Sequence, residues 1–239
     1  MKRFFWALIG LALIGIAGFA ILRLGILSPA AAPELRGVTV LRGVDVARYQ
    51  GVIDWRELKA HDIDFAFIKA TEGGDWTDPK FHDNWLGAKR ANMPRGAYHF
   101  FTLCRDAREQ AEHFLATVGD MNGALIPALD AEHMGPCREE PTMQDVAGGV
   151  LEFLDTVHGA TGARPVIYTT KEYYETHLEG KTPGERFWLR SLITPPDYGE
   201  ADWLFWQYSG NGRRRGIKGP VDLNIFKGDA SALDALIVG

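Results

Sequence analysis

The sequence predicts an α/β fold, an irregular TIM-like β/α barrel preceded by one N-terminal transmembrane helix or signal segment. Short apolar runs alternate along the chain with helical patterns, which favours a parallel sheet covered by helices. Seven or eight such runs fall within about 200 residues, a number that suits a small closed barrel. An open doubly wound sheet is the second possibility.

The N-terminal segment has the properties of a membrane-crossing or export signal. Lys2 and Arg3 precede residues 4–22, which are apolar and carry no charge. A helix of that length spans about 28 Å, close to the hydrocarbon thickness of a bilayer. Positive residues ahead of the span favour export of the chain on its C-terminal side. Ala30-Ala31-Ala32 could supply a cleavage site, so an anchor and a cleaved signal peptide both remain open.

These features divide the chain into three parts. Residues 1–27 form the membrane anchor or signal segment, residues 28–36 a short extended tether, and residues 37–239 the folded domain. We expect the domain to sit in the periplasm or outside, anchored to the inner membrane through residues 4–22, or to be secreted if the segment is cleaved.

The charge of the chain excludes one class of function. The formal net charge is −5, and because residues 1–36 are net positive, the folded part is more acidic still. Binding to phosphate backbones requires a footprint of Lys and Arg. We therefore expect no nucleic-acid partner.

The expected strands are short and rich in β-branched and aromatic residues. In chain order they cover 43–49, 65–71, 95–101, 124–132, 164–170, 187–190, 203–209 and 221–224. Helical patterns separate several of them. Asp54 is a suitable N-cap with Glu57 in the first turn, and Asp78 leads into a second pattern. Residues 105–118 and 142–156 carry apolar stripes at helical spacing.

Polar and acidic residues gather at the expected carboxyl ends of the strands. In a β/α barrel these ends converge on one face, where active sites are built. Acidic groups with aromatic walls suit carbohydrate chemistry, because aromatic faces stack on sugars and carboxylates stabilise a cationic transition state. The residues concerned are Asp45, Glu72, Tyr98, Asp130, Glu132, Tyr168, Gln207 and Asp222.

The central motif is Asp130-Ala131-Glu132. In a strand, residues two apart point to the same side, about 6.5 Å apart. Two carboxyls at that range push one pKa upward, so that one group keeps its proton near neutral pH and can act as a general acid. A pair of solvated loop acids is the alternative interpretation, and the preceding apolar run ALIPAL favours the strand.

Several segments resemble one known family in order along the chain. GVDVARYQGVIDW, FAFIKATEGG, RGAYHFF, LIPALDAE, PVIYTT, LFWQYS and GPVDLN are similar to successive strands of family 25 glycoside hydrolases, the Chalaropsis-type lysozymes. The resemblance covers residues 42–227. It implies a β/α-barrel muramidase that hydrolyses the β-1,4 bond between N-acetylmuramic acid and N-acetylglucosamine in peptidoglycan. The family's acidic positions fall on Asp45, Asp130, Glu132 and Asp222.

The resemblance and the chemistry together suggest roles. Glu132 is expected to protonate the leaving oxygen and then to act as the base for water. Asp130 is either a nucleophile or a group that steers the substrate's 2-acetamido group. Asp45 and Asp222 become neighbours if the barrel closes. Substrate contacts are expected from Tyr98, Tyr168, Trp206, Gln207 and Glu72. We expect no cofactor and no metal.

The chain departs from the family pattern at one wall of the expected cleft. Trp188-Leu189-Arg190-Ser191-Leu192 stands where family members more often read W-[IL]-A-x-Y. The missing tyrosine puts the preferred glycan in doubt. An inactive glycan-binding protein on the same fold, or a hydrolase of another N-acetylglucosamine polymer, therefore remains an alternative.

The two cysteines are a candidate disulfide. Cys104 and Cys137 each follow an expected strand, and the two strands should be neighbours. In an oxidising exported compartment the pair can form a bridge between two loops of the site, and two free thiols are the alternative.

Overall fold

The computed structural model describes residues 32–135, 142–192, 194–199 and 203–239, all within the compact unit Ala32–Gly239. The expected membrane segment 4–22 and Cys137 lie outside the described residues. Among the residues that are described, we find no helix with the length and hydropathy needed to cross a bilayer.

Eight of the described strands form a closed ring, which confirms the predicted barrel. β1 pairs with β9 on one side and with β2 on the other, so the ring has no open edge and the open doubly wound sheet is excluded. A ninth strand, β3 (Trp76–Thr77), pairs only with β2. The ring consists of β1 (Val40–Val46), β2 (Phe65–Glu72), β4 (Arg95–Phe100), β5 (Ala128–Ala131), β6 (Val166–Thr170), β7 (Phe187–Arg190), β8 (Trp203–Gly212) and β9 (Val221–Lys227).

The expectation of an entirely parallel sheet is wrong at β9. This strand runs antiparallel to both β8 and β1, whereas the other neighbouring pairs in the ring are parallel. Only residues 213–220 connect β8 to β9, and a parallel crossover needs a dozen or more residues. The start of β9 therefore lies at the rim where the other strands end.

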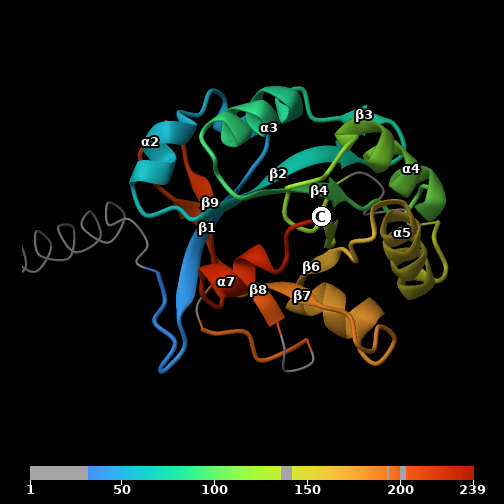
Figure 1. Cartoon of the computed structure of the whole chain (residues 1–239). Helices are drawn as coiled ribbons and strands as arrows, with labels where there is room; N and C mark the ends of the chain where they lie inside the picture. Colours follow the sequence, from blue (N-terminus) through green and yellow to red (C-terminus); the bar gives the residue numbers. More distant parts are fainter. Residues whose placement is uncertain (1–31, 136–141, 193, 200–202) are drawn as a thin grey trace, which may run out of the picture. The chain divides into compact units, whose positions relative to one another are not determined.

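Helices flank the ring of strands (Figure 1). The main ones are α2 (Trp55–Ala60), α3 (Phe81–Arg90), α4 (Ala107–Val118) and α5 (Val146–Thr161). Shorter helices are η1 (Arg48–Gln50), α6 (Lys171–Tyr173), the π-helix η2 (Tyr174–Leu178) and α7 (Ala230–Asp234).

Aspartate caps fix where these helices begin. Asp54 Oδ1 accepts hydrogen bonds from the backbone N–H groups of Arg56 and Glu57, as the sequence predicts. The helix expected from residue 142 begins only at Val146, because the Asp145 side chain caps it through the Gly148 N–H at 2.9 Å. A capping side chain satisfies backbone donors that the first turn leaves unpaired.

Aromatic side chains fill the barrel below the rim. Phe67 stacks on Trp188 with ring centroids 4.7 Å apart and meets Phe205 edge to face at 5.2 Å. Gly96 gives these rings room, because a Cβ there would overlap Phe67. The interior of the barrel is thus a packed core at these residues, as is usual for this architecture.

We predict that Asp54→Ala destabilises the fold by about 1 kcal/mol through loss of the α2 cap. In a domain of this size that corresponds to a fall in melting temperature of roughly 2–4 °C. Thermal unfolding of the full chain in mild detergent, followed by circular dichroism, measures the change.

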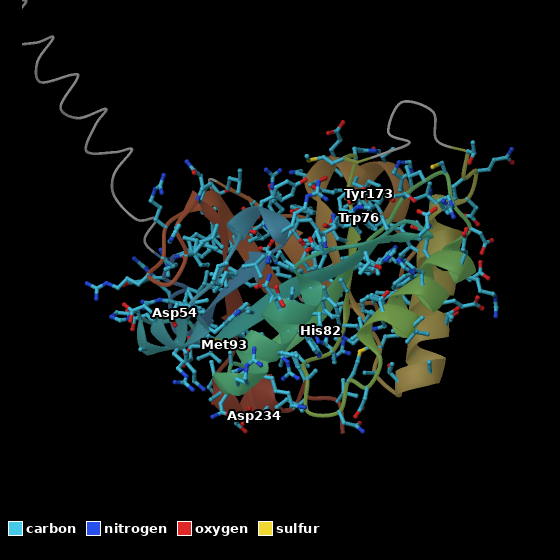
Figure 2. All side chains as sticks on the ribbon, turned by 90° about the horizontal axis from the view of Figure 1, so that it is seen from above. Asp54, Trp76, His82, Met93, Tyr173 and Asp234 are labelled. Atoms are coloured by element: carbon cyan, nitrogen blue, oxygen red, sulfur yellow. The ribbon has the colours of Figure 1, made fainter. Side chains whose placement is uncertain are left out.

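The matched control is Asp234→Ala, at an exposed aspartate for which the described part of the chain provides no side-chain hydrogen bond; both positions are labelled in Figure 2. An equal change in both variants would contradict the capping role.

Candidate active site

The four predicted acids meet in one cavity at the rim of the barrel. The cavity has a volume of about 530 Å³. Asp45, Asp130, Glu132 and Asp222 all line it, although they come from three strands and from the residue after β5. The other predicted residues that line it are Glu72, Tyr98, Tyr168 and Gln207.

Asp45 is held at the end of β1 by two amide side chains. Its Oδ2 atom accepts hydrogen bonds from Gln207 Nε2 at 3.0 Å and from Asn224 Nδ2 at 2.8 Å. Gln207 in turn accepts from the Tyr168 hydroxyl at 3.0 Å, and Asn224 accepts from Trp188 Nε1 at 2.8 Å. These partners fix the orientation of both amides, because each amide oxygen accepts a hydrogen bond while its NH₂ group donates to Asp45. Each chain of donors therefore ends at the Asp45 carboxyl.

Asp222 lies directly opposite Asp45 in the β1–β9 register. Burial, the nearby Asp45 carboxyl and a hydrogen bond with it raise the pKa of Asp222 from 3.8 to about 8. Burial also raises the pKa of Asp45, whereas the hydrogen bonds from Asn224 and Gln207 oppose the rise. The pair therefore holds a proton more readily than two ordinary carboxyls do, and the expectation that barrel closure makes Asp45 and Asp222 neighbours is met.

Asp130 and Glu132 form the second carboxyl pair. Asp130 is 9% exposed, and its Oδ1 atom is buried without a hydrogen-bond partner among the described residues. Burial first, and then the charge of Glu132, raises the pKa of Asp130 well above its usual range. Burial likewise raises the pKa of Glu132, and the positive charge of Arg190 acts in the opposite direction. A carboxyl of this pair can keep its proton near neutrality, as a general acid requires.

The aromatic walls differ in part from the prediction. Tyr98 and Tyr168 line the cavity, and burial raises the pKa of both phenols, so they remain neutral hydrogen-bonding groups. Trp206, which was expected to contact the substrate, is not among the residues that line the cavity. Its indole Nε1–H donates to the Ser191 carbonyl at 2.6 Å, and its ring packs against Trp203. Trp206 follows the inward side chain at position 205 and precedes that at 207, and successive side chains of a strand point to opposite faces.

Glu72 lines the cavity as an ion pair. Its Oε2 atom lies 2.6 Å from Lys69 Nζ. The same ammonium group lies 4.5 Å from the ring centroid of Phe100 and 5.3 Å from that of Trp76, which is labelled in Figure 2. This side of the cavity is therefore neutralised internally.

Sequence reasoning did not place several of the cavity and network residues in the site. Trp188, Arg190 and Tyr49 line the cavity, and Asn224 holds Asp45. The available signal was the period of two along a strand, because Asn224 shares a face with Asp222, and Arg190 shares one with Trp188.

Two further expectations concern a metal centre and a disulfide. Within the described ranges, no group of three His, Cys, Asp or Glu side chains is arranged to hold a metal ion. Cys137 lies outside those ranges, so the Cys104–Cys137 bridge stays a prediction.

Sequence and fold are both similar to known proteins. The family described as glycosyl hydrolases family 25 matches residues 44–217. "Uncharacterized protein YegX" of Escherichia coli (strain K12) is 37% identical over 205 residues, which cover 83% of this chain and 74% of that protein. "Lysozyme M1" of Streptomyces globisporus is 35% identical over 210 residues, covering 82% and 71%. The solved structure of a family 25 glycosyl hydrolase from Bacillus anthracis matches with a TM-score of 0.79 at 34% identity, covering 87% of this chain and 98% of that one.

We predict that stability falls as the pH rises from about 4 to about 8, and that Asp222→Asn reduces this fall. The folded state binds the Asp222 proton more tightly than the unfolded chain does, since the pKa is about 8 rather than 3.8. The stabilisation is therefore complete at low pH and is lost as the pH passes through the folded value. Melting temperatures of the wild type and of Asp222→Asn at pH 5 and pH 8 measure the difference.

Asp234→Asn, at an exposed position, is the control and should retain the wild-type fall. Some fall should persist in Asp222→Asn, because burial raises the pKa values of Asp45, Asp130 and Glu132 as well. The assignment is untenable if the fall in Asp222→Asn equals that of the wild type.

Proposed function

The chain belongs to family 25 of the glycosyl hydrolases, and on that premise we propose that it cleaves the β-1,4 bond between N-acetylmuramic acid and N-acetylglucosamine in peptidoglycan. The observation that carries the proposal is the meeting of Asp130 and Glu132 in one cavity with Tyr98 and Tyr168. A glycan-binding protein needs hydrogen-bonding groups and aromatic walls, but it has no need of a carboxyl with a raised pKa.

Glu132 is the general acid in this proposal. It is half-buried, so a substrate can reach it, and burial raises its pKa so that the proton is retained until the bond breaks. After the leaving sugar departs, the same carboxylate takes a proton from the attacking water. Arg190 limits the rise of the Glu132 pKa, which keeps the proton transferable.

Asp130 holds the 2-acetamido group of the sugar that carries the broken bond. A carboxyl that keeps its proton is a poor nucleophile, and the pKa of Asp130 lies well above its usual range. Asp130 lines the same cavity as Glu132, so in this proposal its carboxyl lies within reach of the acetamide. The acetamide oxygen then attacks the anomeric carbon, and water later opens the cyclic intermediate with overall retention.

Export completes the proposal. Lys2 and Arg3 ahead of the uncharged run 4–22 support transfer of the domain across the inner membrane, where peptidoglycan is accessible. The run then serves as an anchor or is removed as a signal segment.

We predict that Glu132→Gln lowers turnover of peptidoglycan at least about 100-fold, because the amide cannot donate the proton to the leaving oxygen. Purified peptidoglycan is digested with the full chain in mild detergent, and new reducing ends are identified by mass spectrometry. Muramic acid ends are expected from the wild type.

Glu112→Gln, at an exposed glutamate outside the cavity, is the control and should cleave like the wild type. N-acetylglucosamine ends would instead indicate cleavage of the other glycosidic bond, and no product from the wild type would favour the inactive glycan-binding protein. Near wild-type turnover in Glu132→Gln would show that Glu132 is not the general acid.

We also predict that glycan with free 2-amino groups on the muramic residues is cut at least about 100-fold more slowly than acetylated glycan, because the internal nucleophile is missing. Chemical re-acetylation of the same preparation should restore cleavage. Equal rates on both preparations would favour Asp130 itself as the nucleophile.

A further inference from the structure

Arg190 is a cationic residue at the end of β7 that lines the cavity. It ends β7, paired with Thr170 of β6 and with Gln207 of β8, and its side chain lines the cavity. It lies two residues after Trp188, on the same face of the strand, so it stands above the packed aromatic rings at the level of the cavity. In the W-[IL]-A-x-Y pattern that this stretch otherwise resembles, the third position is an alanine, so the cation is a departure of this chain.

The other cations of the cavity are already engaged. Lys69 is paired with Glu72 at 2.6 Å. The Arg48 guanidinium lies 4.7 Å from the ring centroid of Tyr49 and 4.8 Å from that of Trp76, and it donates to the Tyr49 hydroxyl at 3.0 Å.

The guanidinium of Arg190 differs from both. Across the described residues, no carboxylate lies within 4.0 Å of it, and no acceptor takes a hydrogen bond from its side chain. Its charge still reaches the acids, because it lowers the pKa values of Glu132 and Asp222. A half-buried guanidinium with five N–H donors in a fixed fork thus faces the open cavity.

We propose that Arg190 binds a carboxylate carried by the muramic residue of the substrate, and so makes the site selective for anionic over neutral N-acetylglucosamine polymers. The inference rests on the proposed function and specifies the substrate at the same site. A planar fork of donors matches a carboxylate in bidentate geometry, and a charge-assisted pair of this kind is among the stronger hydrogen-bonded contacts. The neighbouring acids Glu132 and Asp222 repel a ligand carboxylate, and both keep protons more readily than ordinary acids, which reduces that repulsion.

Two sources can supply the carboxylate. In strands stripped of peptide, the lactyl group of the muramic residue ends in a free carboxylate. In strands that carry peptides, that group is an amide and the nearest carboxylates belong to the peptide. Chitin-like oligomers have neither and serve as the neutral reference.

The test measures binding without turnover. The full chain with Glu132→Gln, in mild detergent, is titrated calorimetrically with three tetrasaccharides: peptide-free muramic acid–glucosamine, its peptide-bearing form, and chitotetraose. Adding Arg190→Gln should weaken binding of a muramic tetrasaccharide about 10- to 100-fold, the range expected for losing a charged hydrogen-bonded contact. The affinity for chitotetraose should fall less than about 2-fold, because this sugar has no carboxylate to pair with the guanidinium. The muramic ligand with the larger loss identifies the source of the carboxylate.

Two further variants separate recognition from general effects. Arg190→Lys keeps the charge without the fork and should recover part of the affinity for the muramic ligand. Arg213→Gln makes the same change at an exposed arginine outside the cavity and should leave all three affinities unchanged.

If Arg190→Gln lowers the affinity equally for all three sugars, or for none of them, the Arg190 proposal is overturned. The proposed hydrolysis is tested separately by peptidoglycan digestion with the chain that retains Glu132. If peptidoglycan is cleaved but the affinity falls equally for all three sugars, only the selectivity proposal is contradicted. If peptidoglycan is not cleaved but the affinity falls selectively for a muramic ligand, only the proposed hydrolysis is contradicted.

Discussion

The site depends on one buried carboxylate, that of Asp45, and on the two amides that bind it. A carboxyl without partners is expensive to bury, so the donors Gln207 and Asn224 are needed for Asp45 to sit 7% exposed inside the barrel. The amides belong to β8 and β9, and the carboxylate belongs to β1. The hydrogen bonds that satisfy this carboxyl therefore also join β8 and β9 to β1.

Closure of the barrel also brings four carboxyl groups together in one cavity, and their raised pKa values result from this burial and proximity. β9 places Asp222 against Asp45, and the end of β5 brings Asp130 and Glu132 into the same cavity. Burial raises all four pKa values, which favours bound protons over charges. Natural sites accept such a loss of stability where a transferable proton is needed, and the aromatic rings packed beneath the rim hold the strands that carry these carboxyls.

Much of this architecture is readable from sequence, and the failures have physical reasons. Apolar runs marked the ring strands because buried parallel strands are continuously apolar, and polar residues at their ends marked the rim. The direction of β9 depends on the length of the connection before it, which the apolar pattern does not encode. Trp206 and Gln207 are consecutive and cannot both face inward, so the period of two contradicted one of the two assignments. Asn224 and Arg190 were missed because their roles arise from partners far along the chain, with Asn224 lying 179 positions from Asp45.

The antiparallel last strand has a consequence for how the molecule comes into being. Because β9 supplies one wall of the cavity and one of the two donors to Asp45, a growing polypeptide cannot assemble the centre while it is still being made. Contacts between such distant segments also form late and slowly, since a long loop must first be closed. The site is thus absent during the early part of translation and can form only after β9 has been synthesised.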